Sequence, residues 1–71
     1  MERTPVQSRS VSSVGYDRDP SMLEIEFLNG SVYQYFGVPE SIFNGLMNAP
    51  SKGTFLDQFV KKAGYSYACI A

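Results

Sequence analysis

Histidine and tryptophan are absent from this sequence, and cysteine occurs once, as Cys69. Without a histidine, nucleophilic catalysis through a Cys–His pair is excluded by composition. An intramolecular disulfide is excluded as well, which is typical of proteins in a reducing cytoplasm. A metal site would have to be built from carboxylates, and the Asp and Glu residues show no loop spacing of that kind. We therefore expect a protein with no catalytic residues, no metal and no cofactor.

Long apolar runs and a surplus of basic residues are also missing. The apolar runs are only a few residues long, whereas a bilayer-crossing helix needs about 20, and the N-terminus lacks the apolar core of a signal peptide. Six Lys and Arg residues stand against seven Asp and Glu residues, so the net charge is −1. This balance argues against strong, non-specific binding to polyanions and leaves room for a local basic patch. We expect a cytoplasmic protein that does not enter the membrane.

What is present is enough for one small globular domain. The chain has 71 residues, of which 44% are hydrophobic and 18% charged, near the lower size limit for folding without a metal or a disulfide. Residues 1–9 are polar, contain Pro5 and show no periodicity, so we expect a flexible tail there and a single domain over residues 10–71. A first strand is expected over residues 11–16, and the turn-forming residues 17–21 should reverse the chain.

The centre of the chain, residues 23–38, is predicted to be a β-hairpin. Before the Asn29-Gly30 turn, apolar residues alternate with glutamates as in a half-buried strand: Leu23, Glu24, Ile25, Glu26 and Phe27. A second alternating run follows the turn and carries Tyr33 and Tyr35. Its polar and apolar positions fit two different registers.

The two registers place the tyrosines on opposite faces of the sheet, because a slip of one residue exchanges the faces. A two-residue loop would put Tyr33 and Tyr35 on the face of the glutamates. A three-residue loop with Gly30 in a left-handed conformation would pair Tyr33 with Ile25 and Tyr35 with Leu23. We prefer the second register, because it gathers the apolar and aromatic side chains on one face.

Two helical patterns follow the hairpin. An apolar stripe over residues 42–47 predicts a helix that begins at Pro39 and ends before Pro50, although Gly45 weakens it by about 1 kcal/mol relative to Ala. Ser51 is typical of an N-cap, and a second stripe over residues 55–63 stops at Gly64. The C-terminal segment YSYACIA fits either an edge strand or an extended tail. The predicted fold class is α+β, a three-stranded antiparallel meander followed by two short helices packed on one face.

With these elements placed, the sequence resembles the KTSC domain family, a small domain named from the C-terminus of some lysyl-tRNA synthetases and also found as free-standing bacterial proteins. The resemblance spans roughly residues 10–62. The matching segments are Ser13-Val14-Gly15-Tyr16-Asp17, Leu23-x-Ile25-x-Phe27-x-Asn29-Gly30, Tyr33-x-Tyr35, Gly37-Val38-Pro39 and Ala49-Pro50-Ser51-Lys52-Gly53. The family has no settled activity, and the resemblance implies RNA binding partly by association with the synthetase. Thr54, where such domains often have a basic residue, and the apolar C-terminus depart from the RNA-binding pattern.

The first candidate site is the start of the second predicted helix. Ser51, Lys52 and Gly53 offer free backbone N–H groups, a hydroxyl and an ammonium, which suit a phosphate of RNA or of a nucleotide. Lys61 and Lys62 add positive charge at the end of the same helix. An ordinary helix cap after the proline is the favoured explanation of the first three residues, and the helix dipole explains the two lysines. The segment lacks the full length of a P-loop, so we expect no nucleotide hydrolysis.

Tyr33 and Tyr35 admit two interpretations. Exposed sheet aromatics act as stacking platforms in several RNA-binding modules, whereas the preferred register turns these rings toward the core. We favour core packing. Glu24 and Glu26 are spaced like residues of any solvated strand face, which argues against a catalytic acid–base pair.

Two functions therefore remain open. We favour a non-enzymatic binding module whose partner is RNA, weakly bound, or a nucleotide-like anion. The alternative is a protein-interaction or self-association domain, in which a protein partner or a second copy covers Val32 and Phe36 on the sheet face away from the helices. An enzyme is a distant third.

Overall fold

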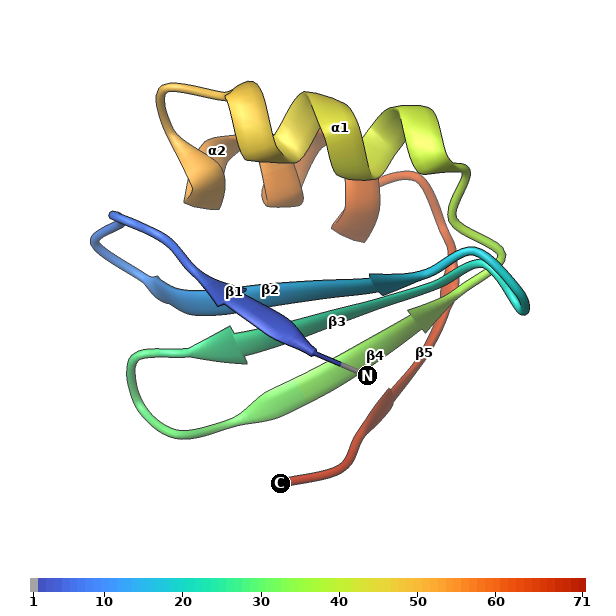
Figure 1. The fold of residues 1–71 in the computed structure, drawn as a ribbon, viewed down its shortest axis with the longest axis horizontal. Helices are drawn as coiled ribbons and strands as arrows, with labels where there is room; N and C mark the ends of the chain where they lie inside the picture. The colour runs from blue at the N-terminus through green and yellow to red at the C-terminus, as the bar shows by residue number, and fades with distance from the viewer. Residues whose placement is uncertain (1) are drawn as a thin grey trace.

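The protein folds as an antiparallel sheet with helices on one of its faces (Figure 1). The structure is a computed structural model that describes residues 2–71. Five strands pair in chain order: β1 (Arg3–Pro5), β2 (Val11–Asp17), β3 (Met22–Phe27), β4 (Val32–Phe36) and β5 (Ser66–Cys69). Between β4 and β5 the chain forms α1 (Glu40–Asn48), α2 (Lys52–Leu56) and η1 (Asp57–Lys61), a π-helical turn that continues α2. The predicted α+β class, with a meander covered by two short helices, is confirmed.

The sheet has two strands more than the three that the sequence predicts. β1 pairs with β2, inside the segment 1–9 that we expect to be a tail, and all three of its residues are exposed. β5 pairs with β4, with Cys69 opposite Tyr33, so the C-terminal segment forms an edge strand. Neither strand buries a full apolar face, and for that reason neither has a strong alternating pattern.

The central hairpin has the register of the three-residue loop. Gly30 has a φ of +92°, a left-handed conformation that favours glycine, and the Phe27 N–H donates to the Ser31 carbonyl at 2.8 Å. The predicted pairs are all present: Leu23 with Tyr35, Glu24 with Gln34 and Ile25 with Tyr33. The glutamates therefore lie on one face of the sheet, and the apolar and aromatic side chains lie on the face toward the helices.

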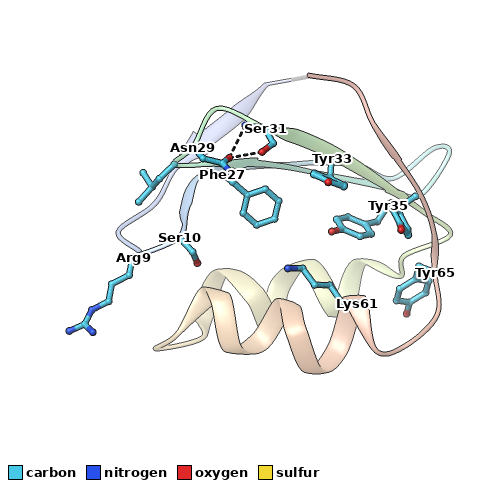
Figure 2. Close-up of a pocket in the computed structure, with 11 residues that line it drawn as sticks. Arg9, Ser10, Phe27, Asn29, Ser31, Tyr33, Tyr35, Lys61 and Tyr65 are labelled. Carbon is cyan, nitrogen blue, oxygen red and sulfur yellow. Dashed lines mark hydrogen bonds between the residues drawn. The ribbon is translucent and has the colours of Figure 1, made fainter.

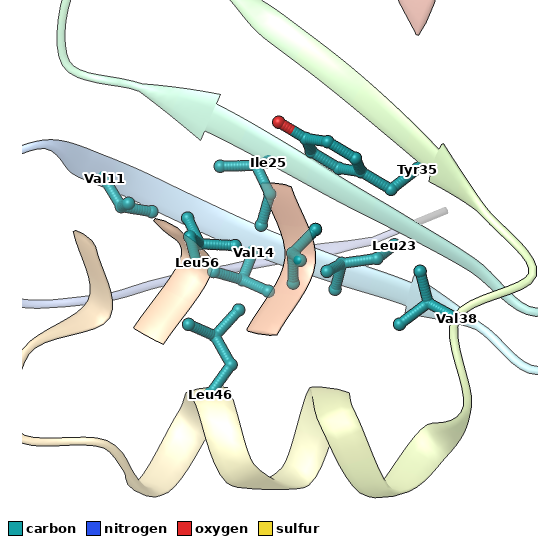
Figure 3. Packing of buried hydrophobic residues seen from close by; sticks show 9 residues of the cluster. Val11, Val14, Leu23, Ile25, Tyr35, Val38, Leu46 and Leu56 are labelled. Atoms are coloured by element: carbon teal, nitrogen blue, oxygen red, sulfur yellow. The ribbon is translucent and has the colours of Figure 1, made fainter. Parts of the chain in front are cut away.

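The core lies between that face and the helices (Figure 3). Its largest fully buried side chains come from every layer: Val11, Val14, Leu23, Ile25, Val38, Leu46, Leu56 and Val60. The two helical segments approach closely at Gly45, where an added Cβ would lie 2.8 Å from Cζ of Phe55. The glycine that weakens the helix prediction thus makes room for the neighbouring helix.

Candidate functional site

An open pocket of about 630 Å³ lies between the sheet and the end of the second helical segment (Figure 2). Five aromatic rings line it: Phe27 from β3, Tyr33 and Tyr35 from β4, Tyr65 just before β5, and Tyr67 in β5. We call this site the aromatic pocket. The centroids of the Tyr33, Tyr35 and Tyr67 rings lie 5.9 to 6.3 Å apart, and Phe27 meets Tyr33 edge to face at 5.8 Å. These are favourable aromatic distances, so the rings support one another.

Both interpretations of the Tyr-x-Tyr motif hold in part. Tyr35 is only 4% exposed and belongs to the core, whereas Tyr33 is half-buried and packs against the core from outside. Tyr67 extends the same ring surface into solvent, with 65% of its area exposed. The Tyr-x-Tyr motif therefore forms the buried side of the pocket, and Tyr67 forms a side that solvent and ligands can reach.

Lys61 supplies a positive charge at this pocket. Its Nζ lies 5.4 Å from the centroid of the Phe27 ring, within cation–π range, and the side chain extends from the helix toward the sheet (Figure 2). The π-helical turn accounts for this direction, because the Lys62 N–H donates to the carbonyl of Asp57, five residues earlier, at 3.1 Å. In a regular α-helix Lys61 would point roughly 140° away from buried Leu56. The wider turn brings it back toward the buried side.

Two phenol groups of the pocket, those of Tyr33 and Tyr35, are favoured in their neutral form. Burial is the main cause that raises the pKa of Tyr35 above 10.0, with Tyr33 and Tyr67 beside it adding to the effect. The neighbouring Cys69 thiol is the main cause that raises the pKa of Tyr33. Tyr33 and Tyr35 therefore offer neutral rings and hydroxyl donors throughout the physiological pH range.

A second open pocket, of about 790 Å³, adjoins the first. It lies between the loop after β1 and the start of α2, and it is lined by Gln7–Ser10 and Pro50–Thr54. We call it the polar pocket, because hydroxyl, amide and backbone groups line it and no aromatic ring does. Arg9 and Ser10 line both pockets.

The predicted phosphate site falls in the polar pocket, but its residues also have structural roles. Ser51 Oγ accepts the Thr54 N–H at 3.3 Å, as expected of an N-cap. Lys52 Nζ donates to the carbonyls of Met47 and Ala49, at 3.1 and 2.7 Å, and so satisfies the end of α1.

Gly53 and the two lysines complete the predicted set. A Cβ at Gly53 would lie 2.7 Å from Ser10 Oγ, so the glycine permits the close approach of the loop after β1. Lys61 lies in the aromatic pocket instead, and Lys62 pairs with Asp57 and lines neither pocket. The structure therefore divides the five predicted residues among three environments.

The basic residues fall into two groups of three. Three are paired with carboxylates: Arg3 with Glu24 at 3.4 Å, Arg18 with Glu40 at 3.0 Å, and Lys62 with Asp57 at 3.6 Å. The other three, Arg9, Lys52 and Lys61, form no ion pair within residues 2–71, and all of them line the two pockets. No Asp or Glu is among the described residues that line either pocket. A protein with a net charge of −1 thus has a locally positive surface here.

The opposite face of the sheet is polar and largely satisfied. Glu24 accepts from Gln34 at 2.8 Å, and Glu26 accepts from Ser13 at 2.8 Å. Val32, which we place on a face available to a protein partner, is only 6% exposed, whereas Phe36 is 39% exposed. This face therefore offers Phe36 rather than a two-residue apolar patch.

Sequence reasoning missed the aromatic pocket as a unit. It singled out Tyr33, Tyr35 and Lys61, but not Phe27, Tyr65 or Tyr67 as their companions. The available signal is the shared parity of Phe27, Tyr33 and Tyr35 in the preferred register, which places all three rings on one face.

Comparison with known proteins gives a consistent result. The sequence model of the KTSC domain matches residues 7–65. An uncharacterized protein of Stutzerimonas stutzeri is 39% identical over 67 residues, which cover 94% of each chain. A crystal structure of a KTSC domain protein from Yersinia pestis has a TM-score of 0.89 and 44% identity, and the match covers 99% of this chain and 97% of that one.

A lysine–tRNA ligase of Nostoc punctiforme is also similar, with 45% identity over 51 residues. The match covers 72% of this chain but only 9% of the ligase. Within residues 2–71, neither helical segment has the length and apolar character needed to cross a bilayer.

Proposed function

This chain belongs to the KTSC domain family, and from that premise we propose that it is a non-enzymatic cytoplasmic module that binds single-stranded RNA weakly in the aromatic pocket. The observation that carries the proposal is the position of Lys61, a cation without an ion-pair partner within residues 2–71, beside the aromatic rings of the pocket. No Asp or Glu is among the described residues that line this pocket. Sites for single-stranded nucleic acid combine these two features, because rings stack on bases and cations attract phosphates.

The exposure of the rings supports stacking by a base. Tyr67 is 65% exposed and borders Tyr33 and Tyr35, so a planar base has an accessible ring face and a rigid support behind it. Single-stranded RNA is recognised through such unstacked bases. The pocket volume of about 630 Å³ falls in the usual range of ligand sites.

The distribution of charge supports weak rather than strong binding. Only Lys61, Arg9 and Lys52 are free of carboxylate partners within residues 2–71, and Lys52 already donates to the carbonyls at the end of α1. Few phosphates are neutralised, so binding should depend only modestly on salt. A sequence similar to this chain forms part of a lysine–tRNA ligase, and that relative favours RNA as the ligand.

The proposal is tested by the anisotropy of fluorescently labelled octauridylate and octaadenylate, titrated with protein at low salt. Lys61→Ala should weaken binding and reduce the slope of log affinity against log salt by about 0.7, the contribution of one phosphate contact. Tyr67→Ala should cost about 1–3 kcal/mol of binding through lost stacking, with little loss of stability because its ring is mostly exposed.

Lys62→Ala is the matched control for Lys61→Ala. It removes the same charge from the adjacent residue, but Lys62 pairs with Asp57 and lines neither pocket. Equal losses for the two lysine variants would place the ligand elsewhere, and the absence of RNA binding by the unaltered protein would refute the proposal. Self-association through Phe36, the alternative, lacks comparable support because Val32, at the other end of β4 on the same face, is buried.

A further inference from the structure

The two pockets meet at a shared wall and differ in chemistry. Arg9 and Ser10 line both of them. The aromatic pocket is lined mainly by aromatic rings. The polar pocket is lined by the hydroxyl, amide and backbone groups of Gln7–Ser10 and Pro50–Thr54. A nucleotide base needs a ring face, whereas a sugar–phosphate chain needs hydroxyl groups, backbone N–H groups and cations. Each pocket therefore matches a different part of a polynucleotide.

Arg9 is suited to the junction of the pockets. Its side chain is exposed, has no carboxylate partner within residues 2–71, and projects outward at the edge of the aromatic pocket (Figure 2). A guanidinium has five N–H donors in a planar fork that matches phosphate. Lys61 lies on one side of Arg9 and Lys52 on the other, so all three unpaired cations follow the path from pocket to pocket.

We infer that the ligand is an RNA strand of at least two nucleotides, with one base in the aromatic pocket and the backbone crossing Arg9 into the polar pocket. This inference rests on the proposed function and adds the size of the ligand and its path. A mononucleotide occupies only the aromatic pocket. A short oligonucleotide reaches both pockets and gains affinity from the second one.

The test compares uridine 5′-monophosphate with the 5′-phosphorylated tri-uridylate by isothermal titration of the unaltered protein. The trinucleotide should bind at least tenfold more tightly. In an NMR titration of labelled protein, the amides of Gly53 and Thr54 should shift with the trinucleotide and stay in place with the monophosphate.

Thr54→Glu provides the decisive variant, because it places a carboxylate in the polar pocket without removing the helix cap. A glutamate three residues after Ser51 completes a capping box, so the fold should be retained. The ratio of the two affinities should fall from at least ten to about one or two. Thr54→Gln is the matched neutral control, since glutamine also completes the capping box, and it should keep the ratio of the unaltered protein.

The outcomes separate this inference from the proposed function. Equal affinity of the unaltered protein for both ligands would overturn the two-pocket path and leave RNA binding at the aromatic pocket standing. An unchanged ratio in Thr54→Glu would also exclude the polar pocket from the path. Failure of both ligands to bind would overturn the proposed function, and this inference with it.

Discussion

At the scale of single residues, Tyr35 shows how one side chain serves both the core and the pocket. Its ring is 4% exposed and pairs with Leu23 across the hairpin, and its hydroxyl stays protonated because burial raises the pKa above 10.0. The folded protein therefore holds this proton more tightly than the unfolded chain does. The stabilising contribution is complete below pH 10 and is lost as the pH rises through the raised pKa of the folded state.

Tyr35→Phe should reduce the sensitivity of the fold to alkali. The variant keeps the ring and removes the titrating group, so its free energy of unfolding should fall less between pH 9 and pH 11 than that of the unaltered protein. Urea unfolding followed by circular dichroism at the two pH values measures this difference. Tyr65→Phe, which removes the hydroxyl of a ring only partly buried against the core, is the natural comparison, and an equal effect of both substitutions would contradict the assignment.

At the scale of elements, the π-helical turn η1 determines which side chains face the pocket. It accommodates one more residue than a regular α-turn, so Val60 remains fully buried while Lys61 reaches over Phe27. Removing one exposed residue from the turn should convert it to a regular α-helix and keep the direction of the residues that follow. In a regular helix, the same deletion rotates the following residues by roughly 100°.

Deletion of Gln58, an exposed residue of η1, is therefore expected to cost at most about 1 kcal/mol. Deletion of Asn44, an exposed residue of α1, should cost at least about 3 kcal/mol, because it turns Leu46 away from the core. Urea unfolding of both variants measures the contrast. If the two deletions are equally damaging, η1 does not act as an extra-residue turn.

Elements of the chain differ in how far the sequence predicts them, and each difference has a physical cause. The hairpin register is predictable because Gly30 and the alternation of Leu23, Ile25 and Phe27 favour the same loop. β5 is harder to predict, because it pairs with β4 across the two helical segments and its residues alternate weakly. The aromatic pocket is harder still. Its rings come from three separate segments, and Lys61 faces them only through a turn that no apolar periodicity reveals.

At the scale of the whole molecule, the N-terminal strand closes one edge of the sheet. β1 buries none of its own residues, but Arg3 contacts Glu24 at 3.4 Å, and Val6 after it packs against the core. The side chain of Glu24 is only 12% exposed, so its charge benefits from a partner. Residues before the domain boundary that we expect at residue 10 thus also contact the domain.

A chain that begins at Val6 should keep the fold and lose about 1 kcal/mol of stability, the upper end of the usual contribution of a partly exposed ion pair. Arg3→Ala in the full chain separates the ion pair from strand pairing, and it should account for most of the loss. Circular dichroism and urea unfolding measure both proteins. Complete unfolding of the shortened chain would show that β1 is required for the sheet.

The pairing of β5 with β4 also closes a long loop of chain. Tyr33 and Cys69 lie opposite each other, and both helical segments lie within the loop between them. Closing a loop of this length costs chain entropy, which the contacts between β4 and β5 must offset. Tyr33 and Tyr67, whose ring centroids lie 6.0 Å apart across this closure, both line the aromatic pocket. A ligand that contacts both rings, as we propose for RNA, would hold the two ends of the loop together, so binding in the pocket would also oppose the detachment of the last strand.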